Sequence, residues 1–240
     1  MTLCGPGLST EDLGFFFEDR HAAFAERAAQ VARNFSENPQ VDVCSATVDA
    51  VQLLAREGLT ALCVPERFGG AAIGSPDHLD CRALTLVRES LGWSSALLDT
   101  AFAMQGLGSY PIALAGTDSQ KSMYLPGVLS GARLGAFALT EPTAGSDVAA
   151  MCCHAERTAD GYRLQGEKTY ISNAGIAGQY VVFAKIDLEA GRKGISAFIV
   201  DAGTRGLEVE PFDVIAPHPI GRLIFKNCDI DASQLLGDEG

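Results

Sequence analysis

The 240-residue sequence has few basic residues and no long apolar run. Its 18 Lys and Arg residues stand against 30 Asp and Glu residues, which gives a formal net charge of −12. An acidic surface repels a phosphate backbone, so we predict no binding to nucleic acid. No apolar run approaches the roughly 18 residues of a membrane-spanning helix. The N-terminus also lacks the basic start and apolar core of a signal peptide, so we expect a soluble, cytoplasmic protein outside the membrane.

Motifs of several enzyme classes are missing. No G-x-G-x-x-G follows a predicted strand, which argues against a Rossmann-type phosphate turn, and neither G-x-S-x-G nor H-E-x-x-H occurs. Residues 161–169 nearly spell a phosphate-binding loop, but Glu167 breaks the spacing and lies in a predicted strand pair. The cysteines are odd in number and form no C-x-x-C, so we predict buried thiols in a reducing compartment, with no disulfide and no metal site. They are residues 4, 44, 63, 81, 152, 153 and 228.

The first half of the chain has helical periodicity. Apolar residues recur at three- and four-residue steps from Glu11 to Phe35, and His21 on this stripe fits a hydrogen-bonded core histidine better than a ligand. Ser75-Pro76-Asp77 has the hydroxyl cap, early proline and acid of a helix start. Thr117 or Asp118 caps a last helix that we expect to end at Pro126. Further helices are predicted over 46–57 and 94–107, and no catalytic group is recognised in this half.

The second half is rich in Val, Ile and Phe and is predicted to be β-structure. Asp160-Gly161 is a hairpin turn signal, and Gly-rich turns separate the remaining runs. The predicted strands are 151–158, 162–168, 179–186, 195–201, 207–212 and 222–230. We therefore predict an α+β chain with a helical domain over residues 1–133 and a small antiparallel β-barrel or sandwich over residues 134–240.

The most informative stretch begins at Phe137 and reads FALTEPTAGSDV. It runs from an apolar strand into a tight loop, where Pro142 fixes its own φ and Gly145 is expected to adopt angles that a side chain forbids. Thr140, Thr143 and Ser146 add hydroxyl groups. Such a loop can offer several donors to a flat ring system or an anion, although an ordinary polar β-turn has the same composition.

A second string follows the hairpin and reads GEKTYISNAG. Tyr170 supplies an aromatic face, and Thr169 and Ser172 supply hydroxyls. The simpler alternatives are that Tyr170 is a core residue and that Ser172 and Thr140 only cap loop backbone.

FALTEPTAGSDVA followed by GYRLQGEKTYISNAGIAGQYVVFAK resembles the acyl-CoA dehydrogenase family of flavoproteins. The likeness extends to the run that contains VPERFGG and to GTDSQKSMYLP, and it covers about Gly58 to Gly240. The family has a helical N-terminal domain, a β middle domain and a helical C-terminal domain. Its reaction removes an α-proton and a β-hydride from an acyl thioester, and FAD accepts the hydride.

The resemblance assigns roles to both strings. It implies that FAD contacts residues of the first string and the edge formed by the second, and that Ser146 also approaches the thioester substrate. The family more often has Trp where this chain has Tyr170. The implied FAD-binding residues are Phe137, Ala138, Leu139, Thr140, Gly145, Ser146, Tyr170, Ile171 and Ser172.

Two departures bear on activity. Residues 213–222, with two prolines, replace a string in which the family usually has an Arg and an S-D-T-like sequence. The sequence stops near LLGDEG, where the family's third domain would begin, and no Glu aligns with the catalytic base which that domain supplies. We therefore assign no catalytic residue, and we expect an oxidoreductase of fatty acid metabolism that works with a partner chain or is a shortened form.

Other possibilities remain open at this level. A non-enzymatic interaction module and a flavin-dependent oxygenase relative would share the scaffold. The resemblance implies an acyl thioester substrate, an electron-accepting flavoprotein as a possible partner, and a homo- or hetero-oligomer that supplies the missing helical domain.

Overall fold

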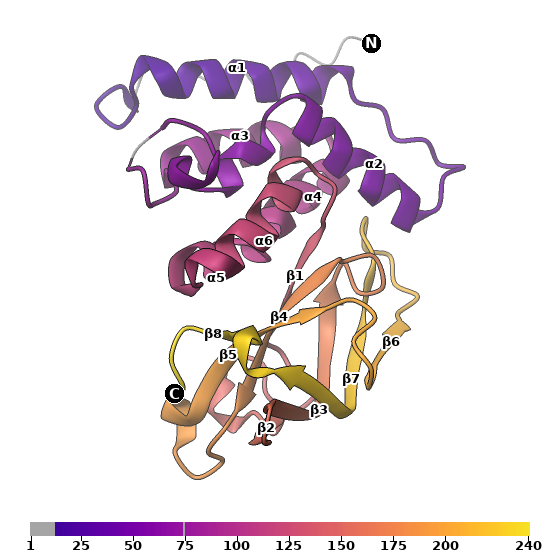
Figure 1. The fold of residues 1–240 in the computed structure, drawn as a ribbon. Helices are drawn as coiled ribbons and strands as arrows, with labels where there is room; N and C mark the ends of the chain where they lie inside the picture. The colour runs from indigo at the N-terminus through magenta and orange to yellow at the C-terminus, as the bar shows by residue number, and fades with distance from the viewer. Residues whose placement is uncertain (1–12, 74) are drawn as a thin grey trace.

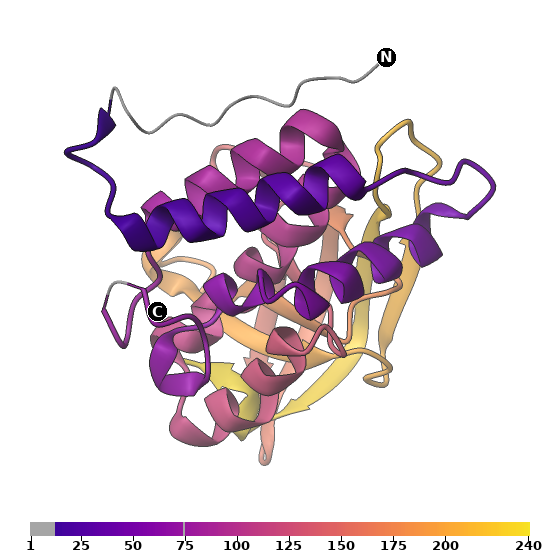
Figure 2. The same ribbon diagram turned by 90° about the horizontal axis from the view of Figure 1, so that it is seen from above.

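The structure is a computed structural model of the chain, and it describes residues 13–73 and 75–240. A layer of helices lies above a β-domain, and strand β1 leads from one into the other (Figure 1). Viewed from above, the helices cover one end of the β-domain (Figure 2). The helices are α1 (Asp19–Asn34), α2 (Val43–Arg56), α3 (Cys81–Ser94), α4 (Ala96–Leu107), α5 (Tyr110–Ala115) and α6 (Asp118–Leu129).

Side-chain caps set the starts of four of the described helices, α2, α3, α4 and α6. Asp42, Ser95 and Thr117 each accept hydrogen bonds from backbone N–H groups of the first turn of α2, α4 and α6. The predicted helix start at Ser75 is wrong. The structure instead begins α3 at Cys81, because the Asp80 carboxylate accepts from the backbone N–H groups of Arg82 and Ala83. Residues 11 and 12 of the first predicted helix lie outside the described residues.

The end of α6 also differs from the prediction. Pro126 lies inside the helix, which continues to Leu129. Proline removes one backbone donor, but Pro126 is exposed, so water can bond the carbonyl that loses its partner. Leu125 and Val128 are fully buried beside it, and their packing stabilises the last turn.

The β-domain is one open, mostly antiparallel sheet. Its strands follow the order β6-β7-β3-β2-β4-β5-β8, and β1 pairs in parallel with β4. The predicted fold class is confirmed in its sandwich form, since no pairing among residues 13–73 and 75–240 closes the sheet into a barrel. The strands are β1 (Gly135–Ala138), β2 (His154–Arg157), β3 (Gly161–Ser172), β4 (Gln179–Lys185), β5 (Ile195–Asp201), β6 (Leu207–Pro211), β7 (Ile220–Asp231) and β8 (Leu235–Leu236).

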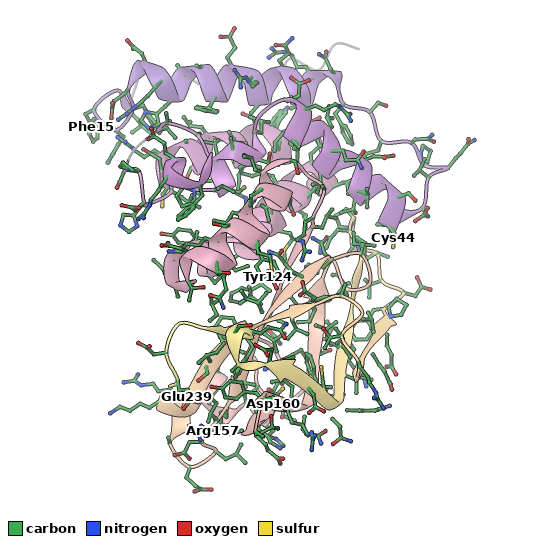
Figure 3. The ribbon with its side chains drawn as sticks, in the orientation of Figure 1. Phe15, Cys44, Tyr124, Arg157, Asp160 and Glu239 are labelled. Atoms are coloured by element: carbon green, nitrogen blue, oxygen red, sulfur yellow. The ribbon has the colours of Figure 1, made fainter. Side chains whose placement is uncertain are left out.

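The two layers meet at a polar junction. The Tyr124 hydroxyl donates to Asp201 over 3.0 Å, and Arg133 pairs with the same carboxylate over 2.7 Å; Tyr124 lies between the layers in Figure 3. A Cβ at Gly108 would come within 2.5 Å of the Gly135 backbone. Only glycine permits this close approach of α4's end to β1. The last α-helix ends at Leu129 and β1 begins at Gly135, and the domain division at residue 133 stays a prediction.

His21 is a buried core histidine. It is fully buried, and its Nε2 lies 3.2 Å from Asp80 Oδ2. The cysteine prediction is partly wrong, because Cys81 and Cys152 are exposed whereas Cys63, Cys153 and Cys228 are buried. Cys4 lies outside the described residues.

Among residues 13–73 and 75–240, none of the helices has the length and apolar character that a bilayer crossing requires. The same residues contain no cluster of three or more His, Cys, Asp or Glu side chains placed to hold a metal ion.

Candidate functional site

The loop that follows β1 is a tight turn with an open outer side. Glu141 and Ala144 exchange backbone hydrogen bonds of 3.0 and 3.2 Å, so Pro142 and Thr143 form the tip. Gly145 and Ser146 are exposed. Gly145 does not have the positive φ that we predicted, but a Cβ there would meet no atom within 4 Å. The missing side chain therefore leaves the backbone of Gly145 accessible from outside.

A buried ion pair holds this loop against β3. Lys168 Nζ lies 2.7 Å from Glu141 Oε1 and also donates to the Leu139 carbonyl over 3.0 Å. The two charged side chains are 0% and 4% exposed. The Glu141 carboxylate accepts two further bonds, from the backbone N–H groups of Cys152 and Cys153. All of these groups are satisfied, as charges in a protein interior must be.

Tyr170 projects from a bulge at the end of β3. The pairing with β7 shifts between Lys168 and Ile171, so Thr169 and Tyr170 together oppose a single residue of β7. Tyr170 has a φ of 56° and is 69% exposed. A left-handed backbone costs a non-glycine residue about 1–2 kcal/mol, and such strain concentrates at functional sites. Its ring makes an edge contact with Phe212 at 5.7 Å between centroids.

Ser172 and Asn173 complete this edge. Ser172 Oγ lies 2.9 Å from His218 Nε2. Asn173 also has a positive φ, 63°, and its side-chain amide donates to the Gly135 carbonyl over 2.9 Å. Burial lowers the pKa of His218 below its usual value, so its imidazole is neutral at pH 7.

The structure brings the two predicted strings together. Thr169 N donates to the Thr140 carbonyl over 2.9 Å, next to the Lys168–Glu141 pair. Phe137, Leu139, Thr140 and Ser172 are half-buried, and Gly145, Ser146 and Tyr170 are exposed. Ala138 and Ile171 differ, because their side chains lie in the β-core and leave only backbone groups for a ligand.

Three contributing residues were missed by sequence reasoning: Glu141, Lys168 and His218. For Lys168 a signal existed. Tyr162 and Leu164 alternate with outward residues along β3, and Lys168 occupies the same inward register. A lysine in that register needs a buried acceptor. His218 carries no comparable local signal.

An apolar pocket opens beside the first string. Its volume is about 410 Å³, and Phe137 of β1 lines it together with residues of α3, α4 and α5. Phe137 therefore belongs both to this pocket and to the strand that enters the loop. The charged residue in its wall, Arg88, forms a two-point ion pair with Asp99 at 2.7 and 2.8 Å. The remaining lining residues are Cys63, Leu79, Cys81, Leu84, Phe102, Ala103, Gly106, Leu107, Tyr110 and Pro111.

Comparison with known families decides what this arrangement is. Residues 16–132 match the family description "Acyl-CoA dehydrogenase, N-terminal domain", and residues 136–228 match "Acyl-CoA dehydrogenase, middle domain". The chain belongs to the acyl-CoA dehydrogenase family. The predicted resemblance is thus confirmed.

Individual relatives agree with this assignment. Isovaleryl-CoA dehydrogenase of Solanum tuberosum is 33% identical over 98% of this chain and 58% of its own length. The 3-(aryl)acrylate reductase of Clostridium sporogenes (strain ATCC 15579) is 33% identical over 93% of this chain and 59% of its own. A solved structure of an acyl-CoA dehydrogenase complexed with FAD from Bacillus anthracis superimposes with a TM-score of 0.75 at 30% identity, over 93% of this chain and 39% of that one. The chain therefore spans 58–59% of the length of these two curated relatives.

Proposed function

We propose that this acyl-CoA dehydrogenase family member binds FAD between the loop Thr140–Ser146 and the edge Tyr170–Ser172, and takes part in α,β-dehydrogenation of an acyl thioester. One observation carries the proposal. The two strings, separated by a hairpin in sequence, are locked together by the buried Lys168–Glu141 pair, and they leave an exposed aromatic ring in a strained backbone beside exposed loop groups.

The residues present fit a flavin. The Gly145 and Ser146 backbone N–H groups donate to no other described residue, so they are available to an oxygen- or nitrogen-rich ligand. Tyr170 offers a flat apolar face, and Thr140 and Ser172 offer half-buried hydroxyls. The FAD-complexed relative supports the same cofactor. When bound, FAD supplies the acceptor for the hydride.

The apolar pocket suits the acyl part of the substrate. A volume of about 410 Å³ lies within the range of small-molecule sites. Phe137 lines the pocket and begins the string that would hold the flavin, so an acyl chain bound there would lie next to the cofactor. Its apolar wall would also exclude water during hydride transfer. Ser146, at the loop's outer side, stays our candidate for contact with the thioester.

Glu141 is not available as the catalytic base. Its carboxylate is 4% exposed and is already engaged by Lys168 and two backbone N–H groups. A base must reach the proton that it abstracts. We therefore propose Glu141 as a residue that positions the loop. The base would come from the family's helical third domain, as the resemblance implies.

The direction of the reaction and the electron partner are part of the proposal. We favour dehydrogenation with an electron-accepting flavoprotein. The similarity to a protein named as an acrylate reductase favours the reverse reaction, addition of hydrogen to a conjugated double bond, as the second candidate.

The decisive experiment is an absorbance spectrum from about 350 to 500 nm, before and after FAD is added and the excess removed. A bound-flavin spectrum that is lost in Tyr170→Ala supports the proposal. Trp93→Ala is the matched control, because Trp93 is a similarly exposed aromatic, 62%, on α3. A wild-type protein that is colourless after incubation with saturating FAD and removal of the excess would contradict flavin binding and favour a non-enzymatic interaction module.

A further inference from the structure

We propose that His218 is a positioning residue for Ser172: it donates its Nε2–H to Ser172 Oγ and so directs the hydroxyl proton of Ser172 to a bound flavin. The inference deepens the proposed function and rests on it. It concerns a residue outside both strings that carry the family resemblance.

The structure fixes His218 from several sides. Its loop is closed at the base by a 2.8 Å hydrogen bond from Phe212 N to the Ile220 carbonyl. Asn173 N donates to the Pro219 carbonyl over 2.8 Å, which ties the loop to the residue after Ser172. Prolines on both sides of His218 restrict its backbone. The 2.9 Å contact with Ser172 Oγ is therefore held by the loop and by the end of β3 at once.

The two ring nitrogens have different surroundings. Nε2 faces the Ser172 hydroxyl, whereas Nδ1 is buried and has no hydrogen-bond partner among the described residues. A buried N–H without an acceptor is rarer in proteins than an acceptor without a donor. The ring proton therefore belongs on Nε2, where it can donate to Ser172 Oγ.

This tautomer decides what Ser172 can do. A serine hydroxyl has one proton and can accept bonds through its oxygen. When Nε2–H donates to that oxygen, the serine proton is free for another acceptor. The opposite tautomer would take the serine proton for itself and leave only an acceptor facing the ligand. His218 thereby makes Ser172 a hydrogen-bond donor toward an electron-accepting ring.

The charged side chains near the His218 loop lie at the edge of the loop. Asp213 on the same loop is exposed, and Glu37 and Asp49 are exposed residues lining a pocket that Pro217 also borders. Glu210 and Arg222 face each other on β6 and β7 at 3.9 Å. None of them is a cause of the lowered pKa of His218, for which burial is the cause. Protonation of Nδ1 would create a charged donor without a partner, in agreement with that direction.

The experiment compares two replacements of His218 in the full 240-residue protein. His218→Gln keeps a side-chain N–H donor, and His218→Leu removes it. We expect His218→Leu and Ser172→Ala each to weaken FAD binding about tenfold, the double variant to lose no more than either single one, and His218→Gln to restore most of the affinity. His78→Leu, an exposed histidine in the helical domain, is the control.

A second measurement is independent of flavin. Ring ¹⁵N chemical shifts of the flavin-free protein at neutral pH should show the His218 proton on Nε2, and Ser172→Ala should change that signal. A proton on Nδ1, or equal FAD affinity of the Leu and Gln variants, would overturn the role of His218 while flavin binding stands. Failure of the wild type to bind FAD would overturn the proposed function and this inference with it.

Discussion

The buried pair of Lys168 and Glu141 makes a prediction that links the stability of the β-domain to its site. Replacing Lys168 by Met removes the ammonium that lies 2.7 Å from Glu141 Oε1 and 3.0 Å from the Leu139 carbonyl. The carboxylate stays buried without its counter-charge. Removing one partner of a buried ion pair costs about 3–5 kcal/mol.

For Lys168→Met, the structure favours the lower end of this range of destabilisation. Glu141 keeps two backbone donors, Cys152 N at 2.6 Å and Cys153 N at 3.0 Å, and these still stabilise the carboxylate. We therefore expect Lys168→Met to lower the free energy of unfolding by about 3 kcal/mol. In a protein of this size that corresponds to a fall in Tm of about 6–12 °C.

A double-mutant cycle isolates the pair. Glu141→Gln with Lys168→Met removes both charges, so the double variant should be less destabilised than the sum of the single ones, by about 1–3 kcal/mol. The measurement is urea unfolding followed by far-UV circular dichroism, with FAD affinity determined on the same samples. Because the pair holds the loop against β3, Lys168→Met should also weaken FAD binding.

The matched control is an exposed pair in the same sheet. Lys226 and Glu208 also lie 2.7 Å apart, but their side chains are 61% and 53% exposed. Lys226→Met should change stability far less than Lys168→Met, because solvent screens exposed charges. A Lys168→Met variant within about 1 kcal/mol of wild type, or a double variant that loses the full sum, would refute the argument.

Three further outcomes are expected. Tyr170→Gly should be more stable than Tyr170→Ala by about 1 kcal/mol in urea unfolding, because glycine tolerates a φ of 56°. Neither variant should bind FAD. Equal stabilities of the two variants would mean that the backbone at this position is not strained. Gly145→Ala should leave stability within about 0.5 kcal/mol but reduce FAD affinity, because its Cβ would point into open space. Hydrogen bonding from Arg82 holds the pKa of Asp80 well below its usual range, so its stabilisation is present above about pH 4 and is lost as the pH falls. Asp80→Asn should therefore lower the unfolding free energy at pH 7, by about 2 kcal/mol, and the difference from wild type should shrink at pH 3.

Much of the fold follows from local patterns. Strand β5 has the bounds predicted for it, because a short run of Ile, Phe and Val bounded by turn signals predicts a strand without reference to the rest of the chain. The prediction of the start of α3 was wrong for a physical reason. Ser75 and Asp80 both precede apolar residues at helical spacing. The choice between the two caps depends on contacts of Asp80 with its neighbour Arg82 and with His21, which is 59 positions away in the sequence.

The candidate site was predictable in its position and less so in its chemistry. Both strings were placed together by the resemblance, and the structure joins them. The alternation of side chains along a strand could also have shown which residues of the first string share a face. Phe137 and Ala138 are neighbours, so they must point to opposite faces of β1. Ala138 is indeed fully buried, whereas Phe137 reaches the pocket.

The ion pair could not be found from either string alone. Lys168 lies 27 positions after Glu141, and nothing local to Glu141 sets it apart from an ordinary turn residue. Only the sheet, which brings β1 and β3 to the same end of the domain, makes the two charges partners. An inward lysine can be tolerated only with a buried acceptor, and a carboxylate in the neighbouring loop satisfies that need. The buried ion pair therefore couples the two strings. Removing the charge of either Lys168 or Glu141 should disturb the loop, the Tyr170 edge and the affinity for flavin together.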